Sequence, residues 1–281
     1  MNRTYRVIEG FSGVGSQRMA LERLAAKHPE LKFEYLYQMD IDKYTVKSYN
    51  EIHGETPNLG DITKLDTLPD CDIFTWSFPC QDLSNAGLKR GMERESGTRS
   101  ALCWEVIRLL TNSHRPEWLL MENVPAILFK TNKPEFDKLC KALEDLGYTN
   151  KYQVLNAVDF DIAQNRKRCF MISHLNGDVP EFPEKRDLTH RLKDYLEDEV
   201  DQKYYLSEER LKGLIISNER ERKKGRGFNF EPFKMDRELS HTVTTREGCV
   251  KIANYILERE REYNIWLDHF KNSEEYRTLS G

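Results

Sequence analysis

The sequence lacks the long apolar stretches that membrane-spanning and exported proteins carry. No apolar run approaches the ~20 residues that cross a bilayer as a helix, and the first residues, MNRTYRVIEGF, contain no apolar core of a signal peptide. We therefore expect a cytoplasmic protein with no membrane partner.

Cysteine spacing of the kind that binds metal is also lacking. None of the six cysteines belongs to a CxxC pair or has a histidine at metal-ligand spacing; they are Cys71, Cys80, Cys103, Cys140, Cys169 and Cys249. We therefore expect reduced thiols and no metal site. The chain has no excess of positive charge either, because 43 Lys and Arg stand against 47 Asp and Glu, a net charge of −4. That balance excludes an overall nucleic-acid-binding coat but permits local basic patches.

The stretch from residue 5 to residue 175 alternates between short apolar runs and amphipathic segments. Strands are expected at 5–9, 33–37, 73–76, 118–121, 152–157 and 169–173, and helices at 16–27, 101–113 and 134–146. Such alternation predicts an α/β fold with a mostly parallel, doubly wound sheet.

Composition changes after residue 180. The segment 181–200 is acidic, and the segment 217–237 is basic and carries several glycines and phenylalanines. We expect a first domain over 1–180, a smaller and less regular region over 181–252, and a helical tail over 253–281.

A glycine turn follows the first expected strand. Gly13 and Gly15 stand between a strand and a helix, where small residues let a ligand approach the backbone. Asp40, at the end of the next strand, has the position at which such folds hold ribose hydroxyls. A tight turn without a ligand is the alternative. The third glycine of the dinucleotide fingerprint is absent, which leaves other adenosyl cofactors open.

Cys80 differs from the other cysteines in its surroundings. It lies in SFPCQDLS (77–84), directly after an expected strand, with polar and turn-forming neighbours. The carboxyl ends of parallel strands face the ligand crevice, so Cys80 is a candidate nucleophile at the active edge, with Pro79 fixing the backbone before it. Most of the remaining cysteines fit a role as buried apolar residues.

Two further groups of polar residues adjoin expected strands. Glu122, after the strand 118–121, is a candidate for proton transfer, and the alternative is an exposed capping residue. If QNRKR (164–168) is extended, then Gln164, Arg166 and Arg168 share one face, which suits an anion. A solvated basic edge is the alternative for this run.

Taken in order, FSGVG (11–15), SFPCQDLS (77–84), ENV (122–124) and QNRKR (164–168) resemble the motifs of the cytosine-5 DNA methyltransferase family of bacteria and phages. The run 77–106 is most similar to the mollicute enzymes that methylate CpG. The resemblance implies a Rossmann-like methyltransferase fold, S-adenosylmethionine as cofactor, and a role in restriction-modification or phage self-protection. It assigns 1–180 to catalysis and 181–252 to target recognition.

The resemblance also implies roles for individual residues. Cofactor contacts would come from Phe11, Gly13, Gly15, Asp40, Ile41, Asp61, Ile62, Pro79 and Leu102. Cys80 would attack carbon 6 of a flipped-out cytosine, Glu122 would hydrogen-bond the base, and Arg168 and Arg166 would support that network. Double-stranded DNA would be contacted, by a monomer, through Gln81, Ser84, Gln164, Lys223, Lys224 and Arg226.

One departure from the family concerns the last residues. The segment 277–281 resembles the beginning of a late family motif, and the Gly-Asn-Ser element that follows in relatives does not occur. We therefore expect weak turnover by this chain alone and rescue by a second polypeptide that carries the element. Two alternatives stay open: a tRNA cytosine-5 methyltransferase, and a catalytically silent DNA-binding fragment or half of a split enzyme.

Overall fold

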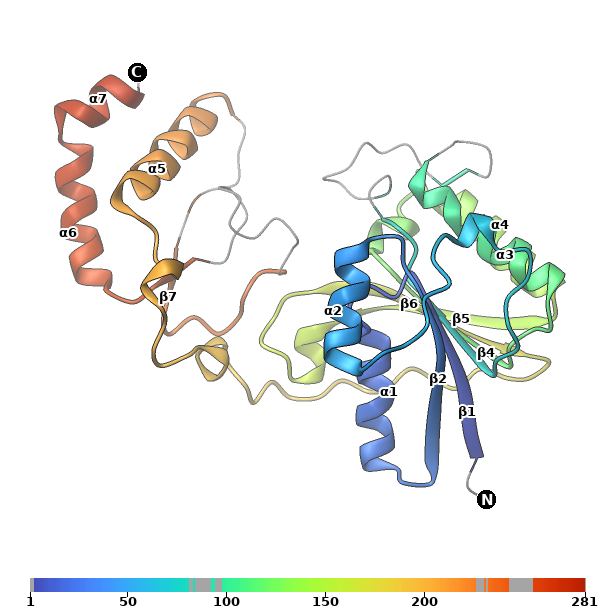
Figure 1. The fold of residues 1–281 in the computed structure, drawn as a ribbon. Helices are drawn as coiled ribbons and strands as arrows, with labels where there is room; N and C mark the ends of the chain where they lie inside the picture. Colours follow the sequence, from blue (N-terminus) through green and yellow to red (C-terminus); the bar gives the residue numbers. More distant parts are fainter. Residues whose placement is uncertain are drawn as a thin grey trace. The chain divides into compact units, whose positions relative to one another are not determined.

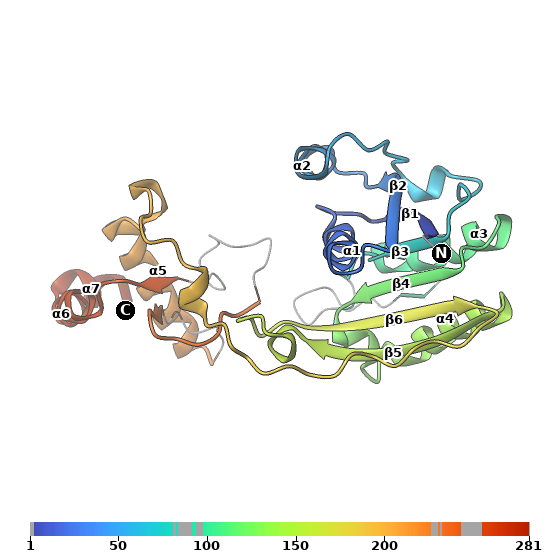
Figure 2. The ribbon, with the colours of Figure 1, turned by 90° about the horizontal axis from the view of Figure 1, so that it is seen from below.

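The computed structural model describes residues 3–80, 83, 92–93, 98–225, 230, 232–242 and 255–280. The chain divides into two compact units, drawn in Figures 1 and 2. The first unit is made of Met1–Leu155 and Lys167–Pro183, and the second of Asn156–Arg166 and Glu184–Gly281. The short segment 156–166 thus belongs with the later part of the chain. None of the helices in the described ranges is long and apolar enough to cross a membrane.

A six-stranded sheet forms the centre of the first unit (Figure 2). Its order is β2 (Leu31–Met39), β1 (Arg3–Gly10), β3 (Ile73–Trp76), β4 (Trp118–Asn123), β6 (Lys167–Leu175) and β5 (Tyr148–Asn156). β1 runs parallel to both β2 and β3, and β3 runs parallel to β4. The predicted α/β fold with a mostly parallel sheet is therefore confirmed.

β6 runs antiparallel to β4, which the alternation of strands and helices did not predict. The reason is the short connection from β5 to β6. It carries only the 3-10 helix η4 (Ala157–Phe160), and a parallel connection needs a crossover of a dozen or more residues. The reversal brings the start of β6 beside the end of β4.

Four helices belong to the first unit: α1 (Ser16–Lys27), α2 (Lys43–His53), α3 (Cys103–Asn112) and α4 (Lys133–Asp145). In Figure 1, α1 and α2 lie to one side of the strands and α3 and α4 to the other. The last two bury apolar residues three or four positions apart, among them Val106 and Leu109 on α3 and Leu139 and Leu143 on α4. These side chains pack with Phe74, Leu119 and Met171 of the sheet into the main core.

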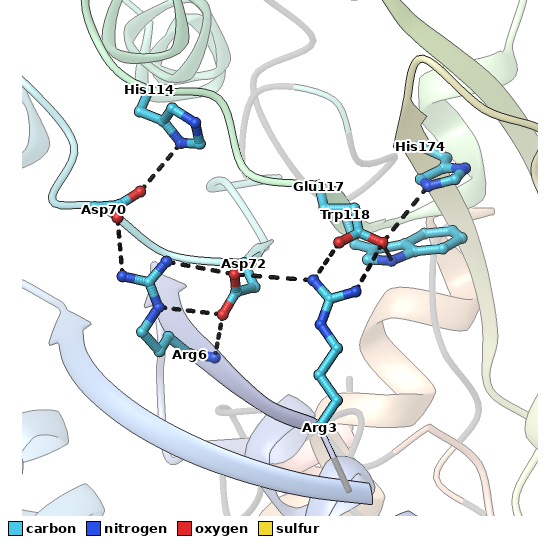
Figure 3. A network of polar contacts seen from close by, with 8 residues as sticks. All are labelled: Arg3, Arg6, Asp70, Asp72, His114, Glu117, Trp118 and His174. Carbon is cyan, nitrogen blue, oxygen red and sulfur yellow. Dashed lines mark hydrogen bonds and ion pairs between the residues drawn. The ribbon is translucent and has the colours of Figure 1, made fainter. Parts of the chain in front are cut away.

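A network of ion pairs fastens the amino end of the sheet (Figure 3). On β1, Arg3 pairs with Glu117, which precedes β4, and Arg6 contacts Asp72, which precedes β3. The Arg6 backbone N–H donates to Asp72 Oδ2 at 2.8 Å. On the neighbouring strands, the rings of Trp118 and His174 stack with centroids 3.9 Å apart. Ion pairs therefore stabilise the amino end of the sheet. The opposite end carries the polar residues at the carboxyl ends of β1 to β4.

The second unit contains helices α5 (Glu208–Lys223), α6 (Glu260–Lys271) and α7 (Glu274–Ser280), the strands β7 (Phe233–Lys234) and β8 (Ile256–Leu257), and the 3-10 helices η5 (Leu192–Tyr195) and η6 (Gln202–Tyr204). Ile215 and Ile216 of α5 pack against Phe270 of α6, with Trp266 and Leu267 beside them. The sequence predicted a less regular region here and missed α5, whose few apolar positions are surrounded by charged residues. The helices of the tail thus pack on α5.

Candidate active site

The glycine turn lies where β1 and β2 end. Phe11, Gly13 and Gly15 all have positive φ, at 54°, 56° and 78°. The Ser12 N–H donates to the Met39 carbonyl at 3.0 Å, and the Gly13 N–H donates to Asp40 Oδ2 at 3.2 Å. Phe11 is a non-glycine residue in a left-handed conformation, a strain that often accompanies a functional turn.

The two glycines of the turn have different surroundings. A Cβ atom added at Gly13 would meet no atom of the described residues within 4 Å, whereas one at Gly15 would lie 2.4 Å from His53 Nε2. Gly13 therefore has open space for a ligand, and Gly15 is required by the packing of His53. The sequence pattern gave both residues the same role and could not separate them.

Asp40 and Ile41 lie beside the open side of the turn. Asp40 Oδ1 accepts from the Asp42 N–H at 2.9 Å, and Asp40 also accepts from Gly13. Ile41 is 79% exposed, which is unusual for an apolar side chain of this size. A carboxylate with remaining acceptor capacity, an exposed apolar side chain and an open glycine fit a ribose with an attached base.

Three further predicted cofactor residues are held by capping bonds or core packing; they are Asp61, Ile62 and Leu102. Asp61 caps η1 (Ile62–Lys64) by accepting from the Thr63 N–H at 3.0 Å and its hydroxyl at 2.8 Å, and these bonds lower the pKa of Asp61. Ile62 is 5% exposed and packs in the core. Leu102 ends η2 (Arg99–Leu102), is partly buried and contacts the same core.

Cys80 lies in the loop that follows β3. Hydrogen bonds to the two backbone carbonyls before Cys80, those of Phe78 and Pro79, anchor this loop. Asn123 Nδ2 donates to the Phe78 carbonyl at 3.0 Å, and Ser100 Oγ donates to the Pro79 carbonyl at 2.8 Å. The Cys80 carbonyl accepts from the Leu83 N–H at 3.0 Å. The position of Cys80 is therefore fixed by the end of β4 and by η2. Gln81 and Ser84 lie outside the described residues.

Cys80 is partly exposed, whereas the other four cysteines in the described part of the chain are buried. Burial raises the pKa of Cys71, Cys140 and Cys169 to about 12 and also raises the pKa of Cys103. These four side chains are protonated thiols near neutral pH. Of the described cysteines, Cys80 is thus the one that is placed to react with a ligand.

Glu122 and Arg168 form an ion pair at the carboxyl end of β4. Arg168 Nε lies 2.8 Å from Glu122 Oε1, and the two side chains are 19% and 24% exposed. The antiparallel register, which pairs Glu122 with Phe170, brings the start of β6 to this position. Next to it, Asn123 is buried and holds the Cys80 loop as described above. One strand end therefore carries Glu122 and also anchors the loop of Cys80.

Gln164 and Arg166 do not continue β6, contrary to the extended run on which the alternation argument rested. The Gln164 N–H donates to the Ile162 carbonyl at 2.6 Å, and the Arg166 N–H donates to the Gln164 carbonyl at 3.0 Å. These bonds between residues two positions apart turn the chain, and β6 begins only at Lys167. The alternation of a strand, on which the prediction of a shared face with Arg168 rested, therefore does not extend to Gln164 and Arg166, which belong to the second unit.

Lys223 and Lys224 occupy the C-terminal end of α5. Lys223 is the last residue of the helix, and Lys224 is its C-cap. Lys224 Nζ lies 3.7 Å from Glu221 Oε1. Positive charges at this end also stabilise the helix through its dipole, so their position has a structural cause as well. Arg226 lies outside the described residues. Within the described ranges, no three His, Cys, Asp or Glu side chains gather as metal ligands.

Sequence reasoning missed two residues that shape the site. The sequence places Asn123 in the ENV motif and predicts no separate role for it. The feature that could have indicated one is a polar side chain close after the expected strand 118–121. Gln17 was not singled out, although its Nε2 donates to Ser77 Oγ at 2.7 Å and so links α1 to the start of the Cys80 loop.

The chain matches the family model described as C-5 cytosine-specific DNA methylase over residues 5–280. It belongs to that family. The assignment made from the four motifs is thereby confirmed.

Curated relatives in the family come from several bacteria. The type II methyltransferase M2.ScrFI of Lactococcus lactis subsp. cremoris is 48% identical over 152 residues, which cover 53% of this chain and 42% of that protein. The orphan methyltransferase M.SssI of Spiroplasma monobiae is 38% identical, covering 73% and 55%. The type II methyltransferase M.NlaX of Neisseria lactamica is 31% identical, covering 86% and 75%. The chain thus spans about half the length of the first two relatives.

Solved structures show the same fold at lower identity. S. pombe Dnmt2 methyltransferase superposes with a TM-score of 0.69 at 24% identity, over 95% of this chain and 80% of that one. A mutant of DNMT2 from Spodoptera frugiperda gives a TM-score of 0.72 at 18% identity, over 98% and 82%. The predicted Rossmann-like methyltransferase fold of this family member is confirmed by that similarity.

Proposed function

We propose that the chain transfers a methyl group from S-adenosylmethionine to carbon 5 of cytosine in double-stranded DNA. The observation that carries the proposal is the strand end at 122–123. There Glu122 is paired with Arg168 at 2.8 Å, and Asn123 anchors the loop of the partly exposed Cys80. Membership of the family supports the same reaction.

The cofactor would lie over the glycine turn. Open space at Gly13, the acceptor atoms of Asp40 and the exposed Ile41 support binding of the adenosine moiety there. The other proposed contacts are Phe11, Gly15, Asp61, Ile62, Pro79 and Leu102. S-adenosylmethionine, when bound, supplies the methyl group that carbon 5 of the base accepts.

The chain's own residues would prepare the base for that transfer. The Cys80 thiolate adds to carbon 6 of the flipped-out cytosine, which makes carbon 5 nucleophilic. Glu122 hydrogen-bonds the ring and stabilises charge that develops during the attack, while Arg168 keeps Glu122 in place and Arg166 supports it. Loss of the carbon-5 proton then restores the aromatic ring and releases the thiolate.

DNA recognition is assigned to 181–252, with 1–180 as the catalytic domain and 253–281 as a tail. The basic end of α5, with Lys223 and Lys224, supports contact with phosphates. Gln81, Ser84, Gln164 and Arg226 complete the proposed DNA contacts. We place the enzyme, acting as a monomer, in a restriction-modification system or in phage self-protection; a type II and an orphan methyltransferase are among its relatives.

The test is incorporation of a labelled methyl group by the purified chain, with unmethylated duplex DNA in one arm and tRNA in another. Label in the duplex at carbon 5 of cytosine is the expected result, weak for the chain alone and stronger when a polypeptide with the Gly-Asn-Ser element is added. Label in tRNA alone would replace DNA with RNA as the substrate. A further arm adds a polypeptide that carries a Gly-Asn-Ser segment, because the relatives are longer than this chain. Absence of label in every arm, with the cofactor bound, would identify a silent DNA-binding protein.

A further inference from the structure

A buried polar cluster contacts the glycine turn from within the first unit. It is formed by Glu9 on β1, Arg18 on α1, Tyr49 and His53 on α2, and Thr56 after α2. The proposed catalytic reaction uses none of these side chains. Their contacts with one another and with the turn assign them a different task.

Glu9 is 1% exposed, and both of its carboxylate oxygens have partners. Oε1 accepts from the Arg18 backbone N–H at 3.0 Å, and Oε2 accepts from the Tyr49 hydroxyl. The N-cap of α1 is Gly15, which has no side chain to accept from the first turn. Glu9 therefore supplies the capping acceptor that this helix start lacks.

Arg18 joins the same cluster to α2. Its Nη1 donates to Thr56 Oγ1 at 3.0 Å, and its Nη2 donates to the His53 carbonyl at 3.0 Å. Its guanidinium also lies over the ring of Tyr35, 4.2 Å from the centroid. The end of α2 is thus fixed against the start of α1, so His53 has one position relative to the turn.

His53 contacts the turn directly. Its side chain is 3% exposed, and Nε2 lies 3.1 Å from the Val14 carbonyl oxygen. Because that oxygen can only accept, Nε2 carries the proton in this contact. The ring also lies against Tyr49, with centroids 4.8 Å apart, and fills the space that a Cβ at Gly15 would need.

We propose that His53, supported by Tyr49, is a positioning residue that holds the glycine turn in its ligand-ready conformation. α2 begins at Lys43, three residues after Asp40, with Asp42 as its N-cap, and ends at His53, which contacts the Val14 carbonyl. One rigid helix therefore fixes the spacing between the carboxylate and the turn. The inference that His53 favours cofactor binding rests on the proposed function, whereas the inference that His53 holds the glycine turn does not.

The experiment compares His53→Ala with His53→Gln, whose amide can again donate to Val14, in the full chain. Hydrogen exchange of the Gly13 and Gly15 amides is measured without ligand, and S-adenosylmethionine affinity by calorimetry. For His53→Ala we expect exchange and the dissociation constant to rise about tenfold each, the effect of one lost hydrogen bond. His53→Gln should recover most of both.

Thr56→Val is the matched control, because it removes the bond from Arg18 within the cluster, and the other hydrogen bonds of Thr56 go to Gln38, Asn50 and Gly54 rather than to the turn. It should lower the melting temperature and leave exchange of the turn unchanged. If His53→Ala changes exchange no more than Thr56→Val does, the inference is wrong. If the wild-type chain binds no S-adenosylmethionine, the proposed function fails, and the exchange result alone decides whether His53 holds the turn.

Discussion

Arg168 Nε lies 2.8 Å from Glu122 Oε1, across the antiparallel pair of strands β4 and β6. A parallel β6 would begin at the amino end of the sheet, next to the ion pairs of Figure 3. The reversed strand instead brings its first residues to the carboxyl end of β4. The direction of β6 therefore allows Arg168, far from Glu122 in the sequence, to reach this carboxylate at the end of β4.

Loss of Arg168 should reduce turnover more than it reduces folding. For Arg168→Ala we expect kcat to fall about 10- to 100-fold, the effect of losing one charged hydrogen bond at the reacting base. Arg3→Ala is a matched control, since Arg3 pairs with Glu117 at the other end of β4. Single-turnover methylation assays should find near-normal rates for the control. Equal losses in both variants would show that Arg168 acts only through stability.

Cys80→Ser should abolish methylation and leave cofactor binding nearly intact, because it removes the nucleophile and little else. Duplex DNA with 5-fluorocytosine in the target should trap a covalent adduct, located by mass spectrometry. The adduct is expected at Cys80 and not at Cys71 or Cys103, whose burial raises the pKa of each thiol. An adduct at either buried cysteine would refute the assignment of the nucleophile.

Removal of Asp40 or Asp61 should weaken the binding of S-adenosylmethionine. We expect Asp40→Ala and Asp61→Ala each to cost about 1–3 kcal/mol of binding free energy, as for a lost buried hydrogen-bond partner. Asp61→Asn separates binding from folding, because asparagine can still cap η1. Calorimetry with unchanged affinity for both alanine variants would contradict the cofactor placement.

Acid should destabilise the first unit through the carboxylates at the amino end of the sheet. The hydrogen bond from Arg3 lowers the pKa of Glu117; burial opposes a lowered pKa for Asp72, but its hydrogen bonds with Arg6 outweigh it. A carboxyl group with a lowered folded pKa stabilises the fold above its unfolded pKa, and this contribution is lost as pH falls toward the folded value. The melting temperature should therefore decrease as the pH is lowered below about 4.5, the ordinary pKa of a glutamate side chain.

Arg6→Ala should flatten this acid dependence, because Asp72 then titrates nearer its unfolded value. Arg259→Ala, which removes an exposed ion pair with Glu262 in the second unit, should leave it unchanged. Thermal melts between pH 3 and pH 7 provide the measurement. An identical pH profile for Arg6→Ala and the wild type would exclude Asp72 as a contributor.

Local patterns were enough to predict much of the first unit. β3 and α1 have the bounds expected from the sequence, 73–76 and 16–27, because each is a clear periodic run between turn-forming residues. α2 was missed, although Asp42 caps it by accepting from two backbone N–H groups. Its signal is a single capping residue, and its helix buries only Tyr49.

The remaining features depend on residues that are distant in sequence. The different surroundings of Gly13 and Gly15 arise from His53, on another helix, and no spacing rule contains that contact. Arg166 and Arg168 are two positions apart, yet they belong to different units, because the first unit resumes at Lys167, where β6 begins. Motif order identified the family because it does not require such contacts to be known.

The inclusion of 156–166 in the second unit has a consequence for replacing that unit, the proposed recognition region, with the one from another enzyme. The chain passes between the units after Leu155, after Arg166 and after Pro183. Asp161 accepts from the Thr189 and His190 N–H groups, and the Ser240 N–H donates to the Ala163 carbonyl. A chimera joined at a single site after residue 183 would leave the segment 156–166 in contact with foreign partners. An exchange of the second unit, the proposed recognition region, therefore has to move 156–166 together with the residues after 183.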